Sequence, residues 1–241
     1  TNKLTINLGI RYELANPFVE VNDQQGNYLL EPGPNFGKMI YPNDTRGTGL
    51  GRALINTDYN NFAPRVGFAW SPSKLNGTTV RAGFGVFYGP GQNDDINAAI
   101  DNDRDRFTLA RSSTINLTYP ITAFVGQGGL APFSPRALDR QRRDFYSQNW
   151  SLSVVQELPF KFTGVVGYVG NTAHKLFSRS AINVINPATG TRPVTAQGTL
   201  RFGEGDIKEN RGNSSFHGLQ MSLYRRIGRG LSVGTEYMWS Q

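Results

Sequence analysis

The residues that could carry chemistry are few and lie far apart in the chain. The only histidines are His174 and His217, and there is no cysteine. A zinc site or a catalytic triad built on histidine needs partners at characteristic spacings, such as HExxH, and the sequence contains no such pattern. We therefore predict no enzyme activity, no catalytic residue, no metal site and no cofactor, and we expect both histidines in or beside loops.

Two further segments imitate functional motifs. Asp101, Asp103 and Asp105 have the spacing with which a calcium-binding loop begins, but Arg106 stands where an EF-hand requires glycine. A basic run at 136–143, RALDRQRR, could attract lipopolysaccharide or an anionic substrate. We interpret both segments as solvated loops.

Composition excludes some classes of protein without selecting one. The 25 Lys and Arg residues against 18 Asp and Glu give a formal net charge of +7. A basic balance permits nucleic acid as a partner, but aromatic residues within strands do not by themselves form a base-stacking platform, so we predict no nucleic acid. The absence of cysteine argues against a small secreted disulfide scaffold.

The elements that must position these residues are strands. Between Asn60 and Gly89 the large residues fall on alternate positions, first as far as Trp70 and, after a short polar turn, again as far as Tyr88. A period of two is typical of a β-strand, and the short turn makes the pair a hairpin. The opposite face carries mostly Gly, Ala, Ser and Arg, which would suit the lining of a wide aqueous lumen.

The same alternation along the whole chain predicts an all-β fold, an antiparallel meander of about seven long strands. We expect these strands near 3–14, 62–71, 78–89, 146–158, 160–170, 214–227 and 230–241. Long loops are expected at 15–61, 90–145 and 171–213, and short turns alternate strictly with them. Outer-membrane barrels have short periplasmic turns and long outer loops, so the connection lengths favour part of a large transmembrane β-barrel.

Other sequence features agree with a barrel. No apolar run approaches 18 residues, which excludes a transmembrane helix, and the first residues lack the flanks of a signal peptide. Aromatic side chains gather at the ends of the expected strands, where amphipathic rings favour the lipid headgroup level. They are Tyr12, Phe62, Trp70, Tyr88, Trp150, Tyr168, Tyr224, Tyr237 and Trp239.

Six blocks of the sequence carry a family resemblance. They are LTINLGIRYE, NNFAPRVGFAW, TVRAGFGVFYG, QNWSLSVVQELP, GVVGYVGN and the final segment from GNSSFHG to the C-terminus. In order and spacing they resemble the barrel segments of Oar-like TonB-dependent outer-membrane receptors. The resemblance implies a plugged barrel in the bacterial outer membrane that binds and imports a ligand with energy delivered through TonB. The implied partners are lipid and lipopolysaccharide, the rest of the barrel and its plug, TonB, and an unidentified ligand.

The strand count indicates a piece of such a barrel. At roughly 34 residues per strand, the 22 strands of a plugged transporter would need on the order of 750 residues. We therefore expect about a third of a barrel, folded as an open curved sheet, with the plug and the TonB box absent from this segment. The alternative function is a soluble or surface-attached β-sheet protein that binds a ligand such as a glycan, which would need no detergent.

The alternation also predicts the direction of the charged side chains. We expect a lumen-facing set on the concave face, where it forms a ladder of partly hydrated ion pairs. Its members are Arg11, Glu13, Arg65, Arg81, Glu157 and Glu236. The convex, lipid-facing side should carry Leu8, Val66, Phe84, Leu152, Leu223 and Val233.

Overall fold

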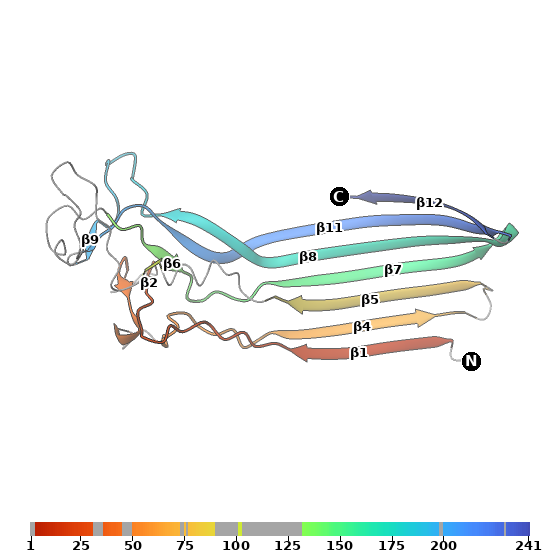
Figure 1. The fold of residues 1–241 in the computed structure, drawn as a ribbon, viewed down its shortest axis with the longest axis horizontal. Helices are drawn as coiled ribbons and strands as arrows, with labels where there is room; N and C mark the ends of the chain where they lie inside the picture. The colour runs from red at the N-terminus through yellow and green to blue at the C-terminus, as the bar shows by residue number, and fades with distance from the viewer. Residues whose placement is uncertain are drawn as a thin grey trace.

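Seven long strands form one open antiparallel meander, as the alternation predicts (Figure 1). A computed structural model of the chain describes residues 3–30, 36–44, 50–72, 75, 77–89, 101–102, 132–197, 200–228 and 230–241. The sheet order is β1-β4-β5-β7-β8-β11-β12, and β1 and β12 are its edges. The strands are β1 (Leu4–Tyr12), β4 (Phe62–Trp70), β5 (Thr78–Tyr88), β7 (Tyr146–Leu158), β8 (Phe162–Ile182), β11 (Gly205–Ile227) and β12 (Leu231–Ser240).

The pairing register gives the sheet one apolar and one polar face. Residues paired side by side share a face, and Leu8 pairs with Val66, which pairs with Phe84, which pairs with Trp150. We call this side the apolar face and the opposite side the polar face. Since the side-chain period is two, a shift of one residue would place the whole apolar set on the polar face.

Short turns join the strands at one end of the sheet. One is a 3-10 turn at Pro159–Lys161, and another contains Gly77 with a φ of +74°. A Cβ at Gly77 would lie 2.6 Å from the Cβ of Glu157, so both the backbone angle and the contact require glycine there. No helix in the described part of the chain is long and apolar enough to cross a membrane.

Two strands run much further than the alternation predicts. β8 and β11 remain paired past the ends of β5 and β7, so the expectation of a loop throughout 171–213 is wrong for 171–182 and 205–213 (Figure 1). An irregularity in the register near Lys175 and Arg211 interrupts the ladder and lets the ribbon twist. Both faces of this extension carry polar residues, so it has no hydrophobic alternation for a sequence to reveal.

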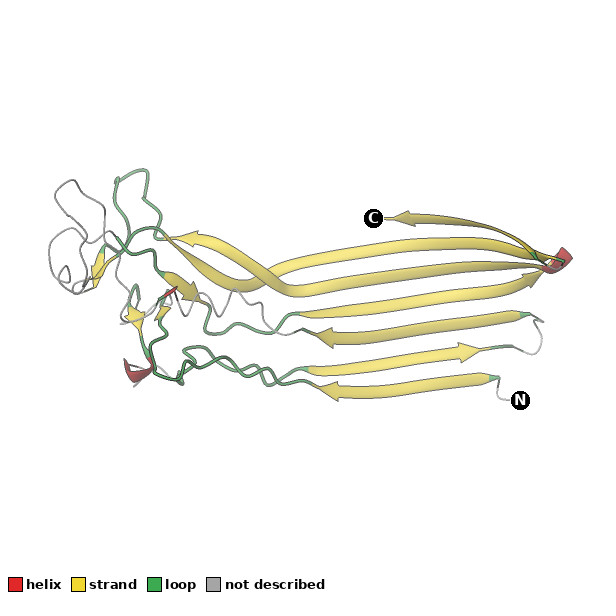
Figure 2. Cartoon of the chain, in the orientation of Figure 1, coloured by secondary structure: helices red, strands yellow, loops and turns green. Residues whose placement is uncertain are grey.

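The long connections contain the buried core of the chain. Small strands occur here, namely β2 (Asn27–Tyr28), β3 (Met39–Ile40), β6 (Arg136–Leu138), β9 (Ala196–Gln197) and β10 (Leu200–Arg201). One apolar cluster joins Tyr28, Met39, Ala137 and Phe202, and another joins Leu29, Ile40, Leu50 and Leu54. We call the described residues of 15–61, 101–145 and 183–204 the loop assembly; Figure 2 shows it gathered at the end opposite the short turns.

Candidate functional site

The six predicted lumen residues all project from the polar face. Arg65 pairs with Gly9 and Gly85, and Arg81 pairs with Ala69 and Ser153. The same register places Arg11 opposite Ala63, Glu157 opposite Thr163 and Glu236 opposite Ser222, with Glu13 two residues beyond Arg11.

The predicted ladder of ion pairs reduces to a single pair among the described residues. Arg11 Nε lies 3.0 Å from Glu13 Oε1, and both side chains are accessible to water. Arg81 lies in the row of Ser153, four residues along β7 from Glu157, which is about 13 Å at the rise of a strand. Arg81 and Glu157 therefore stand too far apart along the strands to pair, whatever their spacing across them.

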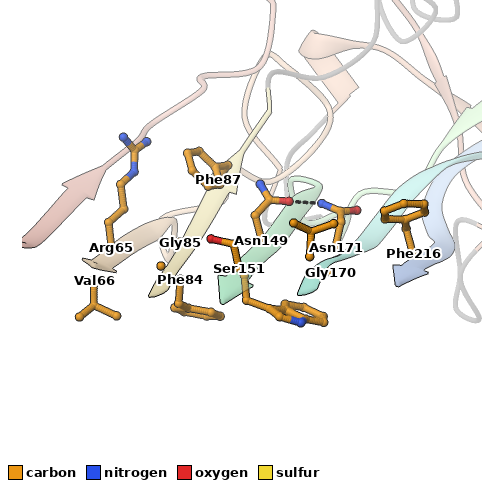
Figure 3. A pocket seen from close by; sticks show the side chains of 13 residues that line it. Arg65, Val66, Phe84, Gly85, Phe87, Asn149, Ser151, Gly170, Asn171 and Phe216 are labelled. Atoms are coloured by element: carbon orange, nitrogen blue, oxygen red, sulfur yellow. Dashed lines mark hydrogen bonds between the residues drawn. The ribbon is translucent and has the colours of Figure 1, made fainter. Parts of the chain in front are cut away.

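Arg65 instead belongs to a hollow in the polar face of about 500 Å³ (Figure 3). Its guanidinium carbon lies 4.4 Å from the centre of the Phe87 ring, in a cation–π contact. Phe87 covers Gly85, where a Cβ would meet the ring at 2.9 Å. Asn171 donates a hydrogen bond to Asn149 in the middle of the hollow, and Phe216 lies at its far side.

The hollow can contact a ligand through three kinds of group. A cation, two carboxamides and two aromatic rings converge on one concave surface, and Figure 3 shows Val66 and Phe84 projecting to the opposite face. Concave surfaces with aromatic walls and a few polar groups are typical of ligand sites. The sequence alternation found Arg65, but it could not find the hollow, because its lining comes from β4, β5, β7, β8 and β11.

Buried carboxamides tie the connections of the loop assembly together. Asn27 is fully buried; its Nδ2 donates to the carbonyls of Leu54 (3.1 Å) and Leu138 (3.0 Å), and its Oδ1 accepts from the Leu138 amide. Asn102, also fully buried, donates to the carbonyls of Gly26 and Arg136. These contacts join residues separated by up to 111 positions, so the loops form a single folded unit.

A carboxylate pair anchors the base of the loop assembly. Asp58 is 5% exposed and accepts hydrogen bonds from Arg143 Nη1 (2.7 Å) and the Asp144 amide (3.0 Å). Burial alone would raise the pKa of Asp58, but the hydrogen bonds from Arg143, Asp144 and Asn60 outweigh it and hold that pKa below its ordinary value.

Asp144 behaves in the opposite way. Burial raises the pKa of its carboxyl; the hydrogen bond from Asn61 Nδ2 (2.7 Å) opposes that rise, and the charge of Asp58 adds to it. Their surroundings therefore shift the pKa values of these two neighbouring carboxyl groups in opposite directions.

The basic run is part of this framework, so the expectation of a solvated loop at 136–143 is wrong for 136–138, which form β6. Arg136 Nε lies 2.9 Å from Asp101 Oδ2, and Arg143 pairs with Asp58. Asp58, from the connection between β1 and β4, and Asp101, from an earlier part of the same connection as the basic run, neutralise these arginines and allow Ala137 and Leu138 between them to be buried. Of the predicted calcium-like motif, Asp103 and Asp105 lie outside the described residues.

The expectation that both histidines lie in or beside loops is also wrong. His174 is in β8 and His217 is in β11, on the apolar face, in the rows of Tyr146 and of Trp150 respectively. His217 Nδ1 lies 2.7 Å from the Tyr168 hydroxyl. Within the described part of the chain, no group of three or more His, Cys, Asp or Glu residues could hold a metal ion.

The apolar face carries a band that can be followed from strand to strand. On β1 it runs from Leu4 to Tyr12, and on β12 from Leu231 to Trp239, with Thr235 as an exception. When paired residues are followed from β1 through β4 and β5, Leu4 lies in the same row as Val154 of β7. Tyr12, eight residues further along β1, therefore lies in the row of position 146. Trp239 is level with Leu152 of β7.

The band therefore shifts by six residues over the six steps from β1 to β12, or one residue per step. With a rise of about 3.3 Å per residue and a spacing of about 4.8 Å between strands, this shift corresponds to a strand tilt of roughly 35°. A nine-residue band and this tilt are the dimensions of strands that cross a bilayer.

One charged side chain lies within the band in the described strands. Arg225 of β11 is near the edge of the band on the side of the short turns, with its guanidinium carbon 5.1 Å from the centre of the Phe162 ring. From that position a long side chain can reach the headgroups.

Comparison with known proteins identifies a family. Residues 1–241 match the model of the outer membrane beta barrel domain over the full segment. No curated protein matches the sequence.

Proposed function

Because the chain belongs to the outer membrane beta barrel family and lies in the bacterial outer membrane, we propose that it is part of an Oar-like TonB-dependent receptor. In this proposal the barrel binds a ligand at the cell surface and imports it. The short turns face the periplasm, and the loop assembly stands on the outside of the cell.

The observation that carries the proposal is the folded loop assembly. Its two apolar clusters and its buried Asn27 and Asn102 hold parts of three long connections in one arrangement. A pore for passive diffusion does not require such a structure, whereas a receptor gains affinity when its binding surface is already ordered. The hollow beside Arg65 offers a second concave surface in the polar wall.

The open edges of the sheet support a larger barrel. β1 pairs only with β4, and β12 only with β11, among the described strands, so each leaves one edge open. Open sheet edges do not occur within lipid. Further strands must therefore pair with both edges. A plug inside the completed barrel would contact the polar wall, where Arg65 and Arg81 offer charge without a carboxylate partner in the described residues.

The full-length parent protein tests the proposal through TonB. Purified in detergent, it should be retained by an immobilised periplasmic domain of TonB, whereas a porin from the same membrane should pass through. A plug and a TonB box in the sequence that precedes Thr1 would agree with retention. Passage of the parent protein through the TonB column would refute import driven by TonB.

We also propose that this segment is not an enzyme. The Tyr168 hydroxyl and His217 lie within hydrogen-bonding distance, but no carboxylate or amide in the described residues contacts the other ring nitrogen of His217. A hydroxyl nucleophile needs a base that is itself oriented by a third group. Hydrolysis of an ester or phospholipid by the purified protein, lost in His217→Ala, would contradict this assignment.

The alternative of a soluble glycan-binding protein has no comparable support. Leu8 is 79% exposed and Ile10 is 73% exposed in the middle of a continuous apolar band. A surface of this kind requires lipid or detergent.

A further inference from the structure

The apolar band ends at different rows on different strands. A shift of one residue per step places its outer edge near the row of Trp150 on β7 and β8, and close to His217 on β11. The strands β8 and β11 continue beyond this edge, and each further residue rises about 3 Å along the membrane normal. Side chains of the next few rows on the same side therefore stand at the level of the lipid headgroups.

The side chains of these rows are hydrogen-bond donors and cations. His217 lies at the edge of the band, Ser215 lies in the next row of the face, and His174 lies in the row beyond. Lys175 reaches back over the face, and its Nζ lies 5.5 Å from the centre of the Tyr146 ring. We call His174, Lys175, Ser215 and His217 the collar.

Two contacts orient the histidines of the collar. The Tyr168 hydroxyl, 2.7 Å from His217 Nδ1, leaves Nε2 of that ring directed away from the strand as a donor when the hydroxyl donates. His174 Nδ1 lies 3.2 Å from Asn213 Oδ1, which can only accept, so His174 donates there. The rings of Tyr146 and Trp150 pack against His174 and His217 at centre distances of 5.2 and 5.8 Å.

The charges around the collar favour an anion. Asp144 is an acid whose charge interacts with both Lys175 and Arg142, and its carboxylate also accepts a hydrogen bond from Asn61, so Lys175 shares this acid with other partners. Glu209 further out on β11 is paired with Arg211 at 2.9 Å. Lipid phosphates are the anions found at this height, and the collar is continuous with the lipid-facing band.

We propose that the collar binds the phosphate groups of an outer-leaflet lipid. Lys175 supplies a charge, His217 supplies a directed donor through Nε2, and His174 packs beside them on the Tyr146 ring. Trp150 and Tyr168 contact the upper parts of the acyl chains. Inorganic phosphate offers the same chemistry, but the position beside the band selects an anion that is attached to a lipid. This site requires only that the chain lies in the membrane, so it does not depend on TonB or on import.

Lipid titration of the purified full-length protein tests the collar. Native mass spectrometry in detergent would measure binding of diphosphorylated lipid A, with chemically dephosphorylated lipid A as the comparison. The triple variant His174→Ala, Lys175→Gln and His217→Ala should bind the diphosphorylated lipid about tenfold more weakly, because it loses charge-assisted hydrogen bonds. Arg226→Gln removes an exposed cation from the polar face of β11, far from the collar, and should bind like the wild type.

Several outcomes would overturn the proposal. They are equal affinity of the wild type for the two forms of lipid A, equal affinity of the triple variant and the wild type, and displacement of the lipid by an equal concentration of inorganic phosphate. Migration of the unboiled protein on an electrophoresis gel reports folding of the barrel. If the triple variant fails to fold, Lys175→Gln alone replaces it, and unchanged affinity of that variant would likewise contradict the proposal.

Discussion

At the residue scale, the loop assembly depends on buried polar side chains that form hydrogen bonds between its connections. Asp58 and Asp144 lie next to each other, yet the pKa of Asp58 is lowered and that of Asp144 is raised. The lowered pKa of Asp58 stabilises the folded loops above the ordinary pKa of aspartate, and this stabilisation is lost as the pH falls through the lowered value. The raised pKa of Asp144 has the opposite effect on stability, because the folded state binds the Asp144 proton more tightly than the unfolded chain does. The folded loops therefore gain stability from Asp144 as the pH falls through the raised pKa.

We therefore predict that the loop assembly is most protected at mildly acidic pH. Protection should increase as the pH falls from neutral through the raised pKa of Asp144, and decrease in stronger acid as Asp58 becomes protonated. Hydrogen exchange of the full-length protein, corrected for the intrinsic rate at each pH, measures this. Asp144→Asn keeps an oxygen for Asn61 and should abolish the increase; an unchanged profile in that variant would contradict the assignment.

Asn27 provides a second test at this scale. Asn27→Ala removes three hydrogen bonds and leaves the buried Leu138 amide and two carbonyls without their partner. We expect a loss of about 1–3 kcal/mol in the stability of the loop assembly, read from the rate of proteolysis within it. The control variant Asn22→Ala, in an exposed part of the same connection, should be cleaved by the protease at the wild-type rate. Similar rates for both variants would show that Asn27 does not join the loops.

At the element scale, the strands combine a membrane segment with an outer segment. The band is nine residues long on both edge strands, whereas β8 and β11 contain 21 and 23 residues. Their additional residues rise beyond the lipid, where both faces meet water or other loops. The same strand therefore alternates in one half and is polar in the other.

The position of the band predicts which substitutions the membrane tolerates. Leu8 is the midpoint of the band on β1 and Tyr12 is its outer end. Leu8→Arg should cost about 2–4 kcal/mol and Tyr12→Arg about 0–1 kcal/mol, since the cost of a charge falls toward the interface. Denaturant titration of the full-length barrel in liposomes measures both. Asn7→Arg, on the polar face beside Leu8, is the matched control and should fold normally; equal costs at Leu8 and Tyr12 would refute the placement of the band.

At the scale of the whole molecule, the polar wall runs along the strands from the short turns toward the loop assembly (Figure 2). The hollow lies at the end of the wall nearest the loop assembly, between Arg65 and Phe216. In a complete barrel this surface would enclose the path from the outside to the lumen. Binding in the loops and contact with a plug would therefore involve neighbouring side chains.

The arginines of the wall allow a test of this arrangement. Arg65→Ala with Arg81→Ala removes two accessible cations, each worth about 0–1 kcal/mol, so the barrel should fold and reach the surface normally. We expect loss of ligand uptake at wild-type surface abundance, because the plug or the ligand loses its charged contacts. Wild-type uptake in the double variant would exclude this role of the wall.

The alternation by itself determined the strands, their two faces and the length pattern of their connections. Leu4 to Tyr12 shows this directly, because a strand with lipid on one side and water on the other must repeat every two residues. Contact with lipid acts on each side chain separately, so it leaves a pattern in residues that are adjacent in the sequence. The family resemblance added the membrane and the receptor hypothesis.

The tertiary structure alone decided how the long connections fold. Asn27 and Leu138 are 111 positions apart, and no periodicity relates them. The basic run looked solvated because its acidic partners are distant in the sequence: Asp58 comes from another connection, and Asp101 from the far end of the same one. His174 looked like a loop residue because the polar outer part of β8 has no apolar face. Such contacts depend on which distant segments the strand pairing brings together. A single sequence contains both residues of each contact but does not indicate that they meet.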